Sequence, residues 1–246
     1  MENEFSIEFS GHLEAQGGGH GRICKCNVSY PAISKPLDHR EGKAYEDLQS
    51  TPLVDCIPKF YGIFDNKIII SDLTAGLTSP CVMDLKVGTR HYDLHATQKK
   101  IDELITKQKG STTDSHGVRI IDGKLRKNGE VVKGWDRKQG LKISYDEFKA
   151  AIHEFLPGDL ISQFRSRLQI IYGKLAQTIA EHPGYRMYAS SILVAYDGDH
   201  PEKGIRCCLI DFAHTFINIE EDGGKIDDPT LNDGVMLGLD TLIHVC

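Results

Sequence analysis

Short apolar segments of strand length fill much of the first seventy residues of the chain. Residues 60–64 and 67–70 are two such segments, and the two polar residues between them are typical of a tight turn that joins antiparallel strands. Residues 17–21 form a glycine-rich break between two further strand-like segments. Glycine permits close backbone approaches, so this break is either a hairpin tip or a cover over phosphate groups. The pattern predicts a small, strand-rich N-terminal lobe over residues 1–73.

Helical spacing of apolar residues follows two polar helix-start signals. Asp38 and Glu41 have the spacing of a capping box, and so do Ser144 and Glu147, so we expect a helix to begin at each pair. A longer helix is predicted to end near His182, and a last helix covers residues 235–245. The predicted buried face of the longer helix consists of Ile161, Phe164, Leu168, Ile171, Leu175 and Ile179.

Three apolar segments in the remainder of the chain are typical of strands: residues 80–88, 188–196 and 205–212. The first is interrupted by Asp84 and Lys86. Successive side chains point to opposite faces of a strand, so these two residues lie on the same face. One face of this strand therefore carries two opposite charges.

Residues 110–140 are polar and contain several glycines. We expect a loop here, with a hairpin within residues 118–132 and Trp135 packed against the rest of the protein. Residues 74–246 are then predicted to form a larger lobe of mixed helix and strand. The predicted fold class is α+β with two lobes.

The composition is that of a folded protein, with 246 residues of which 40% are hydrophobic and 26% are charged. A net charge of −6 gives no reason to expect binding to nucleic acid or to an anionic membrane. No apolar run approaches the ~18 residues that a membrane-spanning helix needs, and the acidic start does not look like a secretory signal. The 7 cysteines are odd in number and scattered, as expected for free thiols in a reducing compartment. An intracellular protein is expected.

Residues 97–142 depart from this overall charge, because they contain 12 Lys or Arg and 6 Asp or Glu. A local charge of +6 suggests an anion-binding site. Residues 98–108 fit a helix on which Lys100, Glu103 and Lys107 form one stripe, so that two ammonium groups face one ligand. The same stripe is also typical of a solvated helix face tied by Glu–Lys pairs. The neighbouring apolar stripe consists of Ile101, Leu104 and Ile105.

Two places hold residues that could bind a metal ion. Cys24 and Cys26 could do so with His20, but a strand with alternating faces explains this pair better. Asp211 ends an apolar strand, where an isolated carboxylate is costly unless it is paired, hydrogen-bonded or bound to a cation. A divalent metal ion would satisfy Asp211, and so would a cap or a buried base.

Further polar residues make Asp211 part of a set. The other members are Lys35, Glu41, Asp84, Lys86 and the Ser190-Ser191 pair. Phosphoryl transfer needs a lysine on the nucleotide phosphates, a carboxylate that holds magnesium, and cations around the acceptor. All three elements are present, so the residues are compatible with a kinase.

Three stretches, in order along the chain, resemble the PxxxDxKxG, SSLL and IDF signatures of the inositol polyphosphate kinase family. They are Pro80 to Gly88, Ser190 to Leu193 and Ile210 to Phe212. The first stretch, with Thr89-Arg90 after it, is the most specific, and further similarities lie in residues 35–41 and in Ala213-His214. Ile192 stands at the first leucine of SSLL, a near-isosteric change that should preserve packing.

The resemblance implies a two-lobed fold distantly similar to that of protein kinases, with ATP between the lobes and Mg²⁺ beside it. On the ATP side, the resemblance implies that Lys35 contacts the ATP phosphates and that Glu41 positions Lys35. The backbone of Ser71 and Leu73 would contact adenine, and Asp84 would contact the ribose. Asp211 would bind magnesium, with Ser191 as its support.

On the acceptor side, the resemblance implies that Lys86 holds the acceptor and stabilises the transferring phosphoryl group. Lys86 and Asp211 are then the expected catalytic residues. The inositol phosphate would be held by Arg90, Lys100, Lys107 and His214, with residues 97–142 as the inositol-phosphate-binding segment. Residues 110–140 match no family pattern, so the resemblance leaves the specificity for the acceptor open.

The implied activity is ATP-dependent phosphorylation of an inositol polyphosphate. The motifs favour inositol hexakisphosphate kinases and a diphosphoinositol product, whereas the compact acceptor region resembles the multikinases, which phosphorylate hydroxyl groups. A non-catalytic inositol phosphate sensor is the alternative from another class. A protein substrate is disfavoured, because the chain has no HRDxxxxN loop and Ala213 replaces the glycine of DFG. We expect a small-molecule substrate, no nucleic acid, membrane span or obligate protein partner, and a cytoplasmic location with nuclear entry left open.

Overall fold

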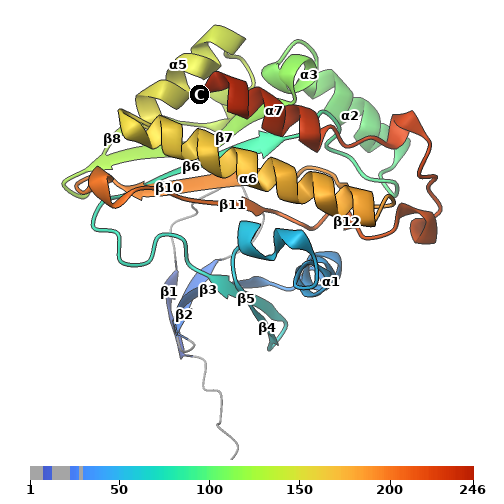
Figure 1. Ribbon diagram of the computed structural model, residues 1–246, viewed down its shortest axis with the longest axis horizontal. Coiled ribbons are helices and arrows are strands. Elements are labelled where there is room, and N and C mark those ends of the chain that lie inside the picture. The colour runs from blue at the N-terminus through green and yellow to red at the C-terminus, as the bar shows by residue number, and fades with distance from the viewer. Residues whose placement is uncertain (1–7, 13–22, 28–29) are drawn as a thin grey trace, which may run out of the picture.

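The computed structural model describes residues 8–12, 23–27 and 30–246, which form two lobes of unequal size (Figure 1). The smaller lobe contains the first strands and one helix, and the larger lobe contains the remaining sheet and most of the helices. This arrangement confirms the predicted two-lobed α+β class. The boundary predicted at residue 73 falls in the connection between the two main sheets and stays a prediction. The glycine-rich segment 17–21 lies outside the described residues.

The smaller lobe is built on a five-stranded antiparallel sheet in the order β1-β2-β3-β5-β4. Its strands are β1 (Glu8–His12), β2 (Cys24–Asn27), β3 (Pro31–Pro36), β4 (Phe60–Phe64) and β5 (Lys67–Ser71). The predicted hairpin of β4 and β5 is confirmed, and Asp65 and Asn66 in its turn both have positive φ, as tight hairpin turns require. A helix, α1 (His39–Leu48), and a 3-10 helix, η1 (Pro52–Cys56), connect β3 to β4.

The start of α1 differs from the predicted capping box in one respect. The Asp38 side chain accepts a hydrogen bond from Glu41 N at 3.0 Å, as an N-cap should. The Glu41 carboxylate does not return to the N-cap, because it binds Lys35 Nζ at 2.7 Å. Ala44, Tyr45 and Leu48 are buried, as the apolar spacing predicted.

The larger lobe contains a second five-stranded antiparallel sheet in the order β11-β10-β6-β7-β8. Its strands are β6 (Pro80–Val87), β7 (Val118–Lys127), β8 (Glu130–Trp135), β10 (Ser191–Asp197) and β11 (Arg206–Ile210). The pairing of β6 with β7 contains an irregularity after Asp84: Asp84 pairs with Asp122, Leu85 with Ile120 and Lys86 with Arg119. A basic side chain of β7 therefore lies beside Lys86, in a register that a regular ladder would not produce.

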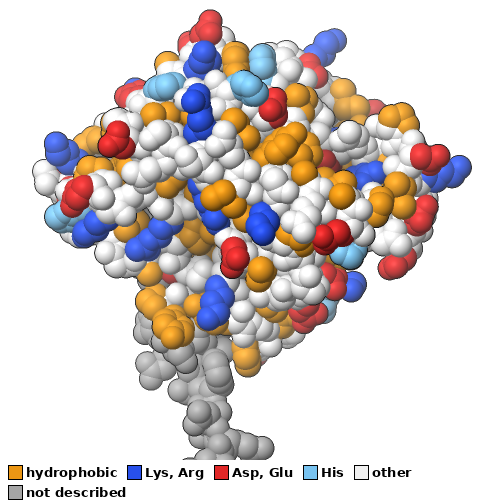
Figure 2. All heavy atoms as spheres, in the orientation of Figure 1, with side chains coloured by type: hydrophobic (Ala, Val, Ile, Leu, Met, Phe, Trp, Pro, Cys, Tyr) orange, Lys and Arg blue, Asp and Glu red, His pale blue; other side chains and the backbone are white. Residues whose placement is uncertain are grey.

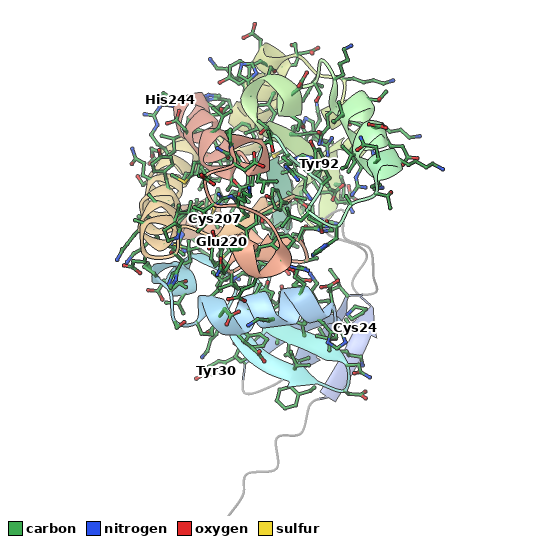
Figure 3. All side chains as sticks on the ribbon, turned by 90° about the vertical axis from the view of Figure 1, so that its right-hand side faces the viewer. Cys24, Tyr30, Tyr92, Cys207, Glu220 and His244 are labelled. Atoms are coloured by element: carbon green, nitrogen blue, oxygen red, sulfur yellow. The ribbon has the colours of Figure 1, made fainter. Side chains whose placement is uncertain are left out.

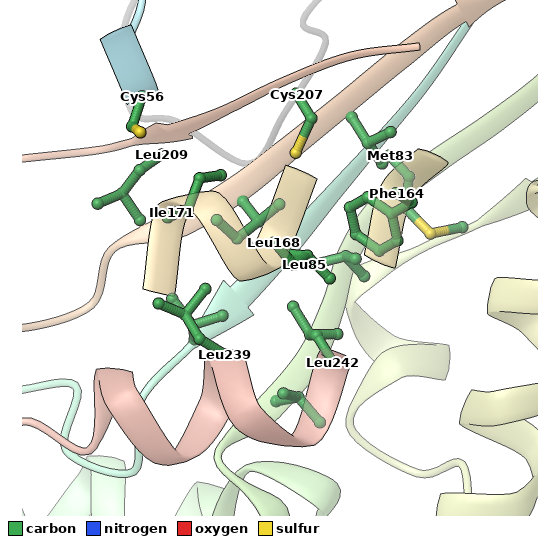
Figure 4. Packing of buried hydrophobic residues seen from close by; sticks show 14 of the residues in the cluster. Cys56, Met83, Leu85, Phe164, Leu168, Ile171, Cys207, Leu209, Leu239 and Leu242 are labelled. Atoms are coloured by element: carbon green, nitrogen blue, oxygen red, sulfur yellow. The ribbon is translucent and has the colours of Figure 1, made fainter. Parts of the chain in front are cut away.

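Helices of the larger lobe pack around this second sheet (Figure 1). They are α2 (Gln98–Gln108), α3 (Thr112–His116), α4 (Arg137–Gly140), α5 (Tyr145–Phe155), α6 (Asp159–Glu181) and α7 (Val235–Val245). A small sheet pairs β9 (Arg186–Met187) with β12 (Thr215–Phe216), and the 3-10 helices are η2 (Pro201–Lys203), η3 (Ile219–Asp222) and η4 (Pro229–Leu231). Figure 4 shows Phe164, Leu168 and Ile171 of α6 packed between the sheet and Leu239 and Leu242 of α7.

The predicted helices at residues 98–108, 145–155 and 235–245 are all present, and Ser144 and Glu147 form the predicted capping box. The apolar stripe of α2 is less buried than its pattern suggested, since Ile105 is 49% exposed. On α6, Phe164, Leu168, Ile171 and Leu175 are buried, and the side chains at both ends of the stripe are half-buried.

The prediction of a loop over residues 110–140 was wrong for most of that segment. The hairpin within it is real but longer, because β7 is a central strand of the sheet and β8 extends to Trp135. Two short helices, α3 and α4, flank the hairpin. Trp135 is buried edge-on against Phe155, as expected. The polar and glycine residues of β7, such as Arg119, Asp122 and Gly123, concealed the strand pattern in the sequence.

The two lobes are tied together at α1 and at the connection after β5. Arg40 of α1 pairs with Asp222 at 3.3 Å, and its guanidinium lies 4.1 Å from the centre of the Phe216 ring in the larger lobe. Arg206 of β11 donates from Nη1 to the carbonyls of Leu73 and Ala75 at 2.8 and 2.7 Å. Figure 3 shows both lobes from the side, with Tyr30 on the smaller one and Glu220 on the larger one.

The end of the connection is anchored by Asp197. Burial alone would raise the pKa of this carboxyl, but hydrogen bonds from the backbone N–H groups of Thr78, Ser79 and Asp199 lower it to about 2. Ser79 Oγ in turn donates to Asp199, and Gly129 N donates to Ser79 Oγ. The connection, the β7–β8 hairpin and the β10–β11 loop are thus joined by one polar network.

Candidate functional site

A cavity of about 710 Å³ lies between the two lobes and collects most of the residues that the sequence singled out. Cavities of this size hold nucleotides and other small ligands. The predicted site residues that line it are Lys35, Glu41, Ser71, Leu73, Asp84, Lys86, Lys100, Lys107, Asp211 and His214. They come from β3, α1, the connection after β5, β6, α2 and the segment after β11.

Lys35, Glu41 and Asp211 meet on the side of the cavity next to the smaller lobe. Glu41 Oε1 accepts hydrogen bonds from Lys35 Nζ at 2.7 Å and from Phe212 N at 3.3 Å. The Glu41 side chain is 3% exposed, whereas Lys35 Nζ remains 3.9 Å from Asp211 Oδ1 with 21% of the side chain exposed. Glu41 therefore fixes the lysine from behind and leaves its ammonium group facing the cavity.

Asp211 reaches this position through an unusual backbone conformation. Its φ is +66°, in the left-handed region, which is uncommon for a residue other than glycine. This turn ends β11 and redirects the chain, and the Asp211 side chain lines the cavity with 32% of its surface exposed. Asp211 is thus neither a helix cap nor the partner of a fully buried base.

Asp84 and Lys86 project from the same face of β6, as their alternation predicted, and both line the cavity. Asp84 is buried at 3% exposure, and Lys86 is half-buried. Burial lowers the pKa of Lys86 below its usual range, although the Asp211 and Asp84 carboxylates oppose this effect. The ammonium group is held on the cavity wall and is only partly hydrated.

Four more basic side chains from α2, β7 and α4 line the same cavity: Lys100, Lys107, Arg119 and Arg137. Burial lowers the pKa of Arg119 to about 10, and the charge of Arg137 acts in the same direction. Burial also lowers the pKa of Lys107, and the charges of Arg119, Arg137 and Lys100 add to that shift. Such mutual repulsion costs stability, and a multiply charged anion at this end of the cavity would relieve it.

Arg119 and Arg137 were missed by the sequence reasoning. Both lie in the segment that was predicted to be a loop, and the net charge of +6 was the only signal that pointed to them. Arg119 is 6% exposed, and its Nε finds no hydrogen-bond partner among the described residues. Because Arg119 also lines the cavity, its guanidinium is a suitable donor group for a phosphate oxygen.

His91 is a second residue that the sequence reasoning missed. It lines the cavity at 8% exposure, its Nε2 contacts the Gly88 carbonyl at 3.0 Å, and its Nδ1 contacts Gln108 Nε2. A carbonyl only accepts hydrogen bonds, so Nε2 carries the ring proton and Nδ1 accepts from Gln108. Burial lowers the pKa of His91 to about 3, and the charges of Lys86 and Arg119 add to this effect. His91 is therefore a neutral link between β6 and α2.

His214 lines the cavity at its edge, and its Nδ1 lies 2.7 Å from Asp93 Oδ2. The hydrogen bond with His214 is the main reason why the pKa of Asp93 is lowered. The backbone carbonyl of His214 also accepts from Tyr188 N at 3.2 Å. The ring is thus held at one nitrogen.

Ser71 and Leu73 lie at the start of the connection and line the cavity beside Thr74. Ser71 N donates to Lys59 O at 2.9 Å, which continues the sheet of the smaller lobe. The Leu73 carbonyl is held by Arg206, as described above. The connection is therefore fixed from both lobes where it borders the cavity.

Two predicted residues are not brought to the cavity. Arg90 donates from Nε to the Tyr92 carbonyl at 3.0 Å and from Nη1 to the Thr230 carbonyl, and its guanidinium lies over the Tyr188 ring. These contacts hold Arg90 in the packing of the larger lobe, and its expected contact with the inositol phosphate stays a prediction. Ser191 is fully buried in β10 and does not line the cavity, so it is not placed as a direct ligand of a metal ion.

The motif glycine, Gly88, follows Lys86 at the end of β6. Its φ is +101°, and a Cβ atom there would lie 2.7 Å from the Asp233 carbonyl oxygen. Only glycine avoids both the strained conformation and this clash. The last position of the PxxxDxKxG motif is thus required for the fold around the site.

The described side chains could hold a divalent cation only together with ligands from outside the protein, such as phosphate oxygens and water. In the part of the chain that the structure describes, no three His, Cys, Asp or Glu side chains are grouped as a metal site. Asp211 offers one accessible carboxylate, and Mg²⁺ is usually held by one or two carboxylates together with phosphate oxygens and water. Of the alternative cysteine site, Cys24 is a half-buried free thiol, and His20 and the Cys26 side chain lie outside the described residues.

Among the described residues, the face of the molecule that α6 covers carries no comparable basic cluster (Figure 2). Figure 2 shows basic and acidic side chains interspersed over the face that α6 covers, without a large area of one sign.

The described cysteines Cys56, Cys81 and Cys207 are buried free thiols, and Cys208 and Cys246 are half-buried. No helix within the described ranges is long and apolar enough to span a membrane.

The comparisons with known proteins agree with the motifs. The family model for inositol polyphosphate kinase matches residues 67–246. Inositol hexakisphosphate kinase 3 of Mus musculus is 27% identical over 203 residues, which cover 72% of this chain and 49% of the relative. Inositol hexakisphosphate kinase 2 of Oryctolagus cuniculus is 33% identical over 143 residues, or 56% of this chain and 33% of the relative. The chain thus spans half or less of the length of these curated relatives.

The fold is also that of a solved structure. The inositol phosphate multikinase Ipk2 of S. cerevisiae, crystallised in complex with ADP and Mn²⁺, superposes with a TM-score of 0.70. The superposition covers 87% of this chain and 97% of the other, at 23% sequence identity. The two chains therefore share the kinase-like fold.

Proposed function

Because the chain belongs to the inositol polyphosphate kinase family, we propose that it transfers the γ-phosphoryl group of ATP to an inositol polyphosphate. The observation that carries this proposal is the division of one cavity into two chemically different ends. One end holds Lys35 with Glu41 and Asp211, and the other holds the four basic side chains of α2, β7 and α4. A nucleotide suits the first end and a polyanionic acceptor suits the second.

ATP enters with its adenine at the connection and its phosphates toward Lys35. The Leu73 carbonyl is already engaged by Arg206, so adenine uses the N–H of Leu73 and the backbone of Ser71. Asp84 binds the ribose, and Lys35 holds the phosphates while Glu41 keeps its ammonium group in place. Asp211 would hold Mg²⁺, which would supply positive charge to neutralise the nucleotide phosphates. The multikinase complex with ADP and Mn²⁺ supports this choice of nucleotide and ion.

The acceptor occupies the basic end. Lys86 lies between the two ends and balances the charge that develops on the transferring group. Lys100, Lys107, Arg119 and Arg137 hold the other phosphates of the acceptor. An acceptor oxygen forms a bond to the γ-phosphorus while the bond from that phosphorus to ADP breaks, and ADP leaves with the electron pair.

We propose inositol hexakisphosphate as the preferred acceptor and a diphosphoinositol as the product. Lys86 and the four basic side chains of the basic end suit the most highly charged inositol phosphate. The hexakisphosphate kinases among the relatives support the choice. A phosphate acceptor is already ionised near neutral pH, so its attack needs no strong general base. Phosphorylation of a hydroxyl on a less charged inositol is the second candidate, which the multikinase fold supports. We propose action in the cytoplasm, with nuclear entry as an open extension.

The test is ATP turnover by the purified chain with Mg²⁺, run in parallel with inositol trisphosphate and inositol hexakisphosphate. Products are separated by anion-exchange chromatography, and ³¹P NMR identifies a diphosphate group. A diphosphate from the hexakisphosphate is the expected result. Turnover of the trisphosphate alone would move the assignment to hydroxyl phosphorylation.

A separate variant and a binding measurement distinguish the kinase from the non-catalytic sensor. Asp211→Asn should abolish turnover and leave binding of the hexakisphosphate, measured by calorimetry, within about threefold of the unchanged chain. Tight binding by the unchanged chain without turnover of either acceptor would replace the kinase with a sensor. Unreduced turnover by Asp211→Asn would refute the assignment of Asp211 to the metal ion.

A further inference from the structure

Asp93 lies behind a cavity residue without lining the cavity itself. Its side chain is 14% exposed, and Oδ2 lies 2.7 Å from His214 Nδ1. Its other oxygen, Oδ1, accepts a hydrogen bond from His95 N at 2.9 Å. Both carboxylate oxygens are therefore engaged, and each has a different donor.

This arrangement determines which nitrogen of His214 carries a proton. A carboxylate accepts hydrogen bonds only, so the neutral His214 ring must hold its proton on Nδ1. The remaining nitrogen, Nε2, is then the atom that the ring offers to a ligand. Because His214 lines the cavity and its backbone is held by Tyr188 N, the position of Nε2 is fixed by Asp93.

We propose that Asp93 is a positioning residue that acts through His214, by keeping Nε2 free of its proton and facing the acceptor. The proposal rests on the proposed function for the nature of the ligand. A neutral Nε2 accepts a hydrogen bond, so it recognises an acceptor oxygen that carries a proton: a hydroxyl or a singly protonated phosphate. His214 would then bind one protonated oxygen among the phosphates that the basic side chains hold.

Because both carboxylate oxygens of Asp93 accept hydrogen bonds, Asp93→Asn changes one of these bonds and keeps the other. His95 N still requires an acceptor, so the amide oxygen of Asn takes the position of Oδ1. The amide NH₂ group then faces His214 Nδ1 and donates to it, which forces the ring proton onto Nε2. The substitution preserves shape and inverts the hydrogen bond that His214 offers to the cavity.

A matched control is available on α7. His244 Nδ1 contacts the Asp240 backbone carbonyl at 2.8 Å and lies 3.5 Å from Asp240 Oδ2. Both side chains are more than half exposed, and neither lines the cavity. Figure 3 shows His244 at the outer edge of the larger lobe, across that lobe from Tyr92, the neighbour of Asp93. Asp240→Asn therefore makes the same chemical change beside a histidine that has no part in the site.

The first measurement is the tautomer of His214 by long-range ¹H–¹⁵N NMR of the imidazole rings, at a pH where the ring is neutral, with His214→Gln to assign the signal. We expect the Nδ1–H form in the unchanged chain and the Nε2–H form in Asp93→Asn. Asp240→Asn should leave the His214 signals in place. An Nε2–H ring in the unchanged chain would overturn the inference.

The second measurement is kinetic. Asp93→Asn should raise the KM for the inositol phosphate about fivefold and leave the KM for ATP unchanged, and the double variant with His214→Gln should be no worse than His214→Gln alone. Additive losses, or an equal rise of both KM values, would overturn the action through His214. A chain without turnover of any inositol phosphate would refute the proposed function, and the tautomer would still decide the role of Asp93.

Discussion

The hydrogen bonds of Glu41 allow a quantitative prediction for the nucleotide end of the cavity. Glu41→Gln keeps the shape of the side chain and removes its charge, so the contact with Lys35 Nζ, now 2.7 Å, loses its ionic part. Hydrogen bonds to charged groups contribute about 1.5–3 kcal/mol. Lys35 is 21% exposed, so solvent screening places the loss in the lower half of that range.

A loss of about 1.5–2 kcal/mol corresponds to a decrease of about 10- to 30-fold in kcat/KM for ATP. Initial rates at varied ATP concentration and saturating inositol phosphate measure this quantity. Glu46→Gln is the control, because Glu46 is exposed on the same helix and should change kcat/KM by less than twofold. A change of less than twofold for Glu41→Gln as well would refute the view that Glu41 holds the lysine for the nucleotide.

Three other predictions concern stability and the connection between the lobes. Burial keeps the His91 ring neutral in the folded protein down to a pKa of about 3, whereas in the unfolded chain the ring binds a proton below pH 6.5. Because the unfolded state binds one more proton in this range, the free energy of unfolding should fall by about 2 kcal/mol from pH 7 to pH 5. Urea unfolding should show that His91→Gln lowers this pH dependence, and an unchanged slope would contradict the buried neutral ring. Arg206→Ala removes the donor that holds the Leu73 and Ala75 carbonyls of the connection. It should raise the KM for ATP about threefold to tenfold and leave the KM for the acceptor unchanged. An equal rise of both KM values would point to misfolding. Gly88→Ala should lower the free energy of unfolding by at least about 2 kcal/mol, because φ at Gly88 is +101° and the Asp233 carbonyl lies close to the added Cβ atom. Gly173→Ala, in the open middle of α6, should raise the free energy of unfolding by up to about 1 kcal/mol. Equal effects of the two substitutions would refute the view that the backbone at Gly88 requires glycine.

Elements with a strong local pattern were predictable from the sequence. The helix at residues 98–108, the capping box before α5 and the β4–β5 hairpin all depend on contacts between near neighbours in the chain. The shared face of Asp84 and Lys86 follows from the two-residue period of a strand, which does not depend on the rest of the protein. The family motifs added expected roles for residues far apart in the chain, such as Lys35 and Asp211.

The composition of the acceptor end was decided by tertiary structure. Arg119 reaches the cavity because β7 pairs with β6 and the register shifts after Asp84, and neither feature leaves a periodic trace in the sequence. Arg90 follows the most specific motif directly, yet the Tyr92 and Thr230 carbonyls hold its guanidinium elsewhere. The sequence by itself determined which side chains alternate, cap and turn, because those preferences act within a few residues. Which basic groups converge on one cavity depends on strand register and on hydrogen bonds between segments far apart in the sequence. These contacts exist only in the folded chain.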